Sequence, residues 1–158
     1  MMKPSELKIF EKLCFKEWTF EMADRFRVPD SHRLYQADAD HVTEIITHLG
    51  YASRFQMCSK VFIVKMKFAG AVYYASPHVD FGHVRLELWA RKDGIKIGGL
   101  TISWCKRYDI HLGQETSDYL PMPAFRNYDE LQNILHKYFR MYEKFKVAVH
   151  ESGYFHNP

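Results

Sequence analysis

Two histidines and an aspartate stand within six positions of the chain, in the stretch SPHVDFGHVRLELW at residues 76–89. His78, Asp80 and His83 offer nitrogen and oxygen ligands of the kind that zinc sites use, and such groups also serve in general acid–base catalysis. No H-E-x-x-H motif, cysteine pair or evident fourth ligand accompanies them. A proline and a glycine flank them, as in turns where Asp and His bond backbone groups. We therefore expect a polar turn, and a small enzyme or ligand-binding site at these three residues is the alternative.

Basic and aromatic side chains share the polar side of two predicted strands. The segment KVFIVKMKF at residues 60–68 alternates apolar side chains with lysines, and HVRLELWARK at 83–92 alternates in the same way. The polar positions of the two segments include Lys65, Lys67, Arg85, Trp89 and Arg91. Cations that neutralise phosphates, next to a ring on which bases stack, are what single-stranded nucleic acid requires. Because the formal net charge is only +3, this function is the second alternative.

A third candidate is SDYLPMPAF at residues 117–125, inside a stretch without periodicity that runs from 109 to 126. Loops of this length are usually functional or mobile. Two prolines stiffen the segment, and its large apolar side chains are Tyr119, Leu120, Met122 and Phe125. These side chains either plug the end of the core or enter a groove of a partner protein. We take the four as the expected partner-binding residues.

The totals bound the class of protein. The chain has 158 residues, of which 47% are hydrophobic and 16% aromatic, which predicts one folded domain over residues 1–158. Cys14, Cys58 and Cys105 are scattered in apolar contexts, so we expect buried free thiols in a reducing compartment. The first ten residues carry charges where a signal peptide has an apolar core, and no run approaches a membrane span. We expect a cytoplasmic protein without membrane contact.

The hydrophobic period changes along the chain. Steps of three and four predict helices over residues 5–26, 38–50 and 127–153. Between the second and third of these the period is two, which predicts a strand at 60–68 and a short strand at 71–74.

The stretch at residues 83–104, HVRLELWARKDGIKIGGLTISW, is expected to form a β-hairpin around its Asp-Gly pair. A two-residue turn would pair Leu86 with Thr101 and mix the two faces of the sheet. A three-residue loop at residues 92–94 instead pairs Leu86 with Leu100 and keeps one face apolar. We therefore expect the three-residue loop.

The predicted fold class is α+β, with two N-terminal helices, a three- to four-stranded antiparallel sheet, and a long C-terminal helix packed on one sheet face. The sequence shows no cofactor motif and no assembled catalytic group, so we expect no metal, no cofactor and no catalysis. The function expected first is that of a cytosolic protein that binds and modulates another macromolecule, another protein before nucleic acid. Immunity proteins and phage-encoded inhibitors act in this way, although the positive charge counts against immunity proteins that bind basic nucleases.

Overall fold

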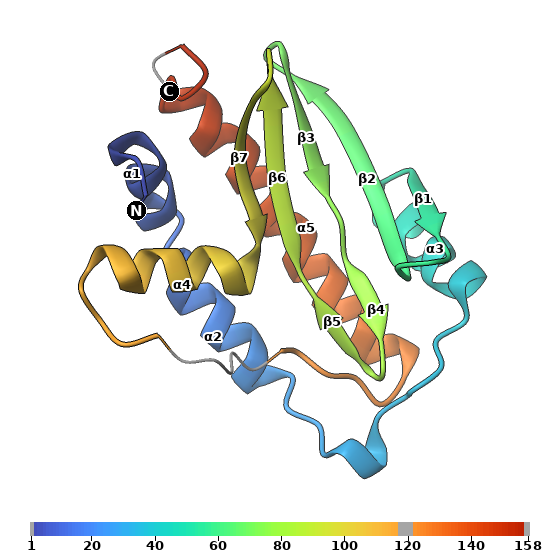
Figure 1. Ribbon diagram of the computed structural model, residues 1–158. Coiled ribbons are helices and arrows are strands. Elements are labelled where there is room, and N and C mark those ends of the chain that lie inside the picture. The colour runs from blue at the N-terminus through green and yellow to red at the C-terminus, as the bar shows by residue number, and fades with distance from the viewer. Residues whose placement is uncertain (1, 117–121, 157–158) are drawn as a thin grey trace.

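The structure is a computed structural model that describes residues 2–116 and 122–156, and it has an α+β architecture (Figure 1). The α-helices are α1 (Pro4–Lys12), α2 (Phe15–Arg25), α3 (Ala39–His48), α4 (Thr101–His111) and α5 (Tyr128–Glu151). The strands are β1 (Ser53–Gln56), β2 (Val61–Phe68), β3 (Ala71–Ala75), β4 (His78–Asp80), β5 (His83–Arg85), β6 (Glu87–Lys92) and β7 (Ile95–Leu100). A short 3₁₀ helix, η1, covers Asp30–His32. The described part of the chain thus has seven strands, more than the three or four expected.

The higher strand count comes partly from two breaks in one long hairpin. Strand β3 pairs with β6 and strand β4 pairs with β5 in a single continuous antiparallel register, with Ala75 opposite Leu88 and His78 opposite Arg85. Residues 71–80 and 83–92 therefore form one extended ribbon, whose two arms are each interrupted near the middle. Strand β2 continues the sheet on one side of this ribbon and β7 on the other.

The inward face of the sheet is apolar, and the long helix α5 packs on it. Along the second arm of the ribbon, Leu86 and Leu88 are buried while the intervening residues point outward, as the alternation predicted. From α5, the Tyr138 hydroxyl donates a hydrogen bond to the Glu87 carbonyl, and the Tyr142 hydroxyl donates to the Tyr73 carbonyl at 2.9 Å. The predicted packing of a C-terminal helix on one sheet face is confirmed.

The predicted helix over residues 5–26 is two helices. Helix α1 ends at Lys12, and α2 begins at Phe15 after Cys14, which has a left-handed φ of 47°. Three α-helices therefore precede the sheet instead of two. The hydrophobic period carries through the break, because both helices bury their apolar side chains in the same core.

The β6–β7 turn corrects the predicted register. It is a two-residue turn, with Asp93 at φ 50° and Gly94 at φ 81°, and it places Glu87 opposite Leu100. The three-residue loop is therefore wrong. The two-residue register is tolerated because glycines 98 and 99 carry no side chains to mix the faces, and because the chain leaves the sheet at Thr101.

Helix α4 was not predicted, since its first residues were assigned to the hairpin strand and its last to an irregular stretch. Its buried side chains are Trp104 and Cys105, together with Thr101 at its start. Of the other cysteines, Cys14 and Cys58 are exposed, so the expectation of buried thiols is correct for Cys105 alone. None of the helices in the described part of the chain has the length and apolar character needed to span a membrane.

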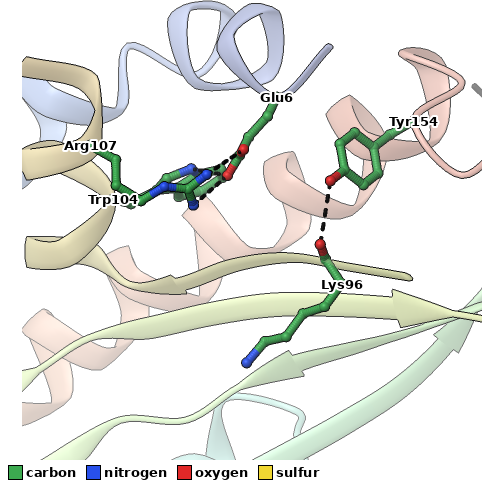
Figure 2. Close-up of polar contacts among 5 residues, drawn as sticks. All are labelled: Glu6, Lys96, Trp104, Arg107 and Tyr154. Atoms are coloured by element: carbon green, nitrogen blue, oxygen red, sulfur yellow. Dashed lines mark hydrogen bonds and ion pairs between the residues drawn. The ribbon is translucent and has the colours of Figure 1, made fainter. Parts of the chain in front are cut away.

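A buried carboxylate joins α1 to α4. Glu6 is 3% exposed and accepts hydrogen bonds from Trp104 Nε1 at 3.0 Å and from the two terminal nitrogens of Arg107 at 2.8 and 2.7 Å (Figure 2). Both partners come from a helix about a hundred residues further along the chain. A carboxylate at this depth is stable because each of its oxygens has a donor.

Candidate functional site

The outward side of the sheet carries two cross-strand rows of polar and aromatic residues. Four strands align Lys65 of β2, Tyr74 of β3, Trp89 of β6 and Gly98 of β7 in the first row. The next row aligns Lys67, Val72, Arg91 and Lys96. We call the resulting surface the basic sheet face: Lys65, Lys67, Tyr74, Arg85, Trp89, Arg91 and Lys96. The two rows bring together Lys65, Lys67, Trp89 and Arg91, and Arg85 lies on the same side of the sheet further along the ribbon, opposite His78.

The basic sheet face is open. Helix α5 lies behind the sheet in Figure 1, and no helix crosses the front of strands β2, β3 and β6 among the residues described. All five cationic side chains of this face are exposed. The surface is therefore accessible to a partner as large as another macromolecule.

Tyr74 and Trp89 form a preformed aromatic stack at the centre of this face. Their ring centroids are 3.8 Å apart and their planes differ by 3°. Lys96 Nζ lies 4.4 Å from the Trp89 centroid, and the Arg91 guanidinium carbon lies 5.8 Å from the Tyr74 centroid. Since β3 and β7 flank β6 on opposite sides, Tyr74 covers one face of the Trp89 ring and Lys96 covers the other. The stack offers a partner its ring edges and the surrounding cations.

Sequence reasoning missed Tyr74 and Lys96. Tyr74 lies in the predicted strand at residues 71–74, but the sequence did not show that this strand pairs with the one that carries Trp89. Lys96 was missed because the predicted three-residue loop gave the β6–β7 hairpin a different register. The Lys96 carbonyl accepts a hydrogen bond from the Tyr154 hydroxyl at 3.3 Å, and the Lys96 side chain extends away from that contact (Figure 2). The C-terminal segment therefore helps to hold β7 where Lys96 reaches the stack.

The cations of the basic sheet face lack carboxylate partners. Within the described residues, none of the five lies within 4.0 Å of an Asp or Glu oxygen. Glu87, which alternates to the same side of the sheet as Arg85 and Trp89, is engaged by His78, whose Nε2 lies 3.2 Å from Glu87 Oε2. Arg85 Nη2 approaches the other ring nitrogen of His78 at 3.4 Å. The face therefore carries a local excess of positive charge that an anionic partner can neutralise.

His78, Asp80 and His83 lie at one end of this sheet surface. The turn between β4 and β5 consists of Phe81 and Gly82, both at positive φ. Because Asp80 pairs with His83, and His78 lies two residues before Asp80, the three side chains share the outward side of this hairpin. Asp80 is paired with Lys60 at 3.0 Å and accepts a hydrogen bond from the Phe81 N–H. Within the described residues, no three His, Cys, Asp or Glu side chains are close enough together to hold a metal ion. The contacts of the cluster are those of a polar hairpin end.

His83 differs from the other two because it is half-buried. Its Nδ1 is buried without a hydrogen-bond partner among the described residues. Burial lowers the pKa of His83, and the positive charges of Arg33 and Arg85 lower it further. A neutral imidazole at this position is consistent with packing under the segment that carries Arg33.

The segment at residues 117–125 is described only from 122 onward, so Tyr119 and Leu120 lie outside the described residues. Phe125 has an exposed fraction of 0% and donates its backbone N–H to the Gly82 carbonyl at 2.9 Å. Phe125 is thus a core residue, as expected if these side chains plug the end of the core. Met122 is partly exposed beside a small apolar cavity of about 180 Å³.

The fold and the site together define a small α+β domain with an open, basic and aromatic sheet face. Comparison with known protein families, with curated proteins and with solved structures found no match to this chain.

Proposed function

We propose that this chain is a non-catalytic binding protein that modulates another protein, and that it contacts an acidic surface of that partner through the basic sheet face. The observation that carries the proposal is the set of five exposed cations on the same sheet face as the Trp89–Tyr74 stack, none of which has a carboxylate partner among the described residues. Such a face carries an excess of positive charge in the isolated chain, and the negative charges of an acidic partner neutralise it.

The residue types of this face and the fixed arrangement of its aromatic stack favour a protein partner. Interfaces are enriched in tryptophan, tyrosine and arginine, and these residues carry most of the binding energy when they are central. Trp89 and Tyr74 are central here, and they already hold each other at 3.8 Å. Because the stack exists before binding, little side-chain entropy is lost when a partner covers it.

Single-stranded nucleic acid is the second candidate, because Lys65, Lys67 and Arg91 surround an aromatic ring on one open sheet. Bases bind such a sheet by stacking on a free ring face. Tyr74 and Lys96 occupy the two faces of Trp89, so a base has to displace the Lys96 ammonium group from the ring. This cost places nucleic acid after an acidic protein.

The test compares two charge reversals of equal size. One variant combines Lys65→Glu with Lys67→Glu, on the basic sheet face, and the control combines Lys3→Glu with Lys8→Glu, on and before helix α1. The proteins are immobilised, and nuclease-treated native lysate is passed over them at 150 mM salt. We expect the wild type and the control to retain the same partner protein, and the sheet-face variant to lose it. Equal retention by both variants would refute the proposal.

A second arm addresses nucleic acid with a fluorescein-labelled oligo-dT strand and anisotropy. Binding that weakens steeply between 50 and 200 mM salt, and that needs Trp89 and Lys65, would replace the protein partner with single-stranded nucleic acid.

A further inference from the structure

A second basic surface lies in the helical layer, in a cleft of about 210 Å³ between α2 and α5. Its lining residues are Trp18, Glu21, Met22 and Arg25 from α2, and Lys137, Arg140, Met141 and Lys144 from α5. It shares no residue with the basic sheet face. A binding role of this cleft is therefore independent of the function proposed for the basic sheet face.

Helical spacing explains how two segments far apart in sequence build this cleft. Residues 18, 21 and 25 on α2 and residues 137, 140 and 144 on α5 both follow steps of three and four, which place side chains on one side of a helix. Seven residues of helix rise by about 10.5 Å, so the charged groups line the cleft over roughly that length. The two stripes face each other across it.

The charge in the cleft is unbalanced. Arg25, Lys137, Arg140 and Lys144 meet one carboxylate, Glu21, which leaves an excess of three positive charges. The whole chain has a formal net charge of +3, so this cleft alone holds as much excess charge as the entire protein. None of these five side chains is within 4.0 Å of an opposite charge among the described residues.

The walls of the cleft strengthen the effect of this charge. Met22 and Met141 are buried, and Trp18 is partly buried, so apolar surface lies between the cations. Low-dielectric walls concentrate the field of like charges and raise the local concentration of counter-ions. The repulsion among the cations is relieved when an anion enters.

We infer that this cleft binds a small phosphate-bearing molecule with at least two phosphate groups. Two arginines supply planar donors for bidentate contacts with phosphate oxygens, and two lysines supply compact charges. The cleft volume of about 210 Å³ suits a short polyphosphate chain. A length of about 10 Å accommodates more than one phosphate along the cleft.

The experiment is isothermal titration calorimetry of the full chain with sodium tripolyphosphate and separately with ATP, at 50 and 200 mM NaCl. The cleft variant combines Arg140→Ala with Lys144→Ala, and the control removes the same charge with Lys3→Ala and Lys8→Ala, two exposed lysines outside both basic surfaces. We expect saturable binding of one tripolyphosphate per chain and a loss of at least about tenfold in affinity in the cleft variant, since each lost charge-assisted contact is worth about tenfold. The control should stay within about threefold.

A gain of binding provides a test that does not depend on damaging the cleft. Glu21→Gln removes the one carboxylate that the described residues contribute to the cleft lining, and it should tighten tripolyphosphate binding by about threefold or more. Absence of saturable binding, an equal effect of the cleft and control variants, or unchanged affinity with Glu21→Gln would overturn the inference. Binding of tripolyphosphate without ATP would keep the site and assign it to polyphosphate chains.

Discussion

Replacing Glu6 by alanine tests how strongly the buried polar contact between α1 and α4 stabilises the fold. Glu6 accepts one hydrogen bond from the Trp104 indole and two from the Arg107 guanidinium. Because α4 lies about a hundred residues away from α1, these bonds fix the first helix to the rest of the molecule. Their loss should lower the free energy of unfolding rather than alter any binding surface.

The magnitude follows from the burial of each partner. Trp104 is 1% exposed, so its indole N–H would be left buried without an acceptor, at a cost of about 1–3 kcal/mol. The Arg107 side chain is 42% exposed and can be hydrated again when Glu6 is removed. Loss of the Arg107–Glu6 ion pair should therefore lower the free energy of unfolding by less than about 1 kcal/mol, as for a surface ion pair. The free energy of unfolding should therefore fall by about 1–4 kcal/mol, which corresponds to about 2–16 °C in Tm for a chain of this size.

Equilibrium urea unfolding at pH 7, followed by circular dichroism and tryptophan fluorescence, measures this change. Glu6→Gln retains an acceptor for Trp104 and should cost only about 1 kcal/mol. Lys12→Ala breaks the exposed Lys12–Glu151 contact and should leave the free energy of unfolding close to that of the wild type. A Glu6→Ala protein as stable as the Lys12→Ala protein would refute the reasoning.

Two further predictions concern backbone geometry and pH. Gly98→Ala places a Cβ 2.2 Å from a carbonyl oxygen of β6 at a φ of +88°, so it should lower the free energy of unfolding in urea by about 2–5 kcal/mol. Gly94→Ala adds a Cβ in open space at a φ of +81°, so it should lower that free energy by only about 1–2 kcal/mol. Equal costs would contradict the close strand packing at Gly98. For His83, whose pKa in the folded protein is lowered below 6.5 by burial and nearby positive charge, the unfolded chain binds the proton more readily. The free energy of unfolding should therefore decline as the pH falls below about 6.5, and His83→Gln should flatten that decline. An NMR titration that gives His83 a pKa of 6.5 or above would contradict this.

Local interactions are what the sequence by itself determined. Asp38 and Asn127 cap α3 and α5, with each side-chain oxygen 2.9 Å from a backbone N–H two or three residues ahead, because a cap depends only on neighbouring positions. The alternation along residues 83–92 could be predicted from the sequence because it too depends only on neighbouring positions. It placed Arg85, Trp89 and Arg91 on one side of the sheet without knowledge of any partner strand.

Only the tertiary structure decided which of these local elements meet. The turn at Asp93 was read as one residue too long, because apolar matching across strands assumed side chains where the chain has glycines. The Trp89–Tyr74 stack depends on the pairing of β3 with β6, and the cleft depends on α2 lying against α5. Contacts between residues far apart in sequence arise when the common core is packed, and no local pattern of residues encodes them.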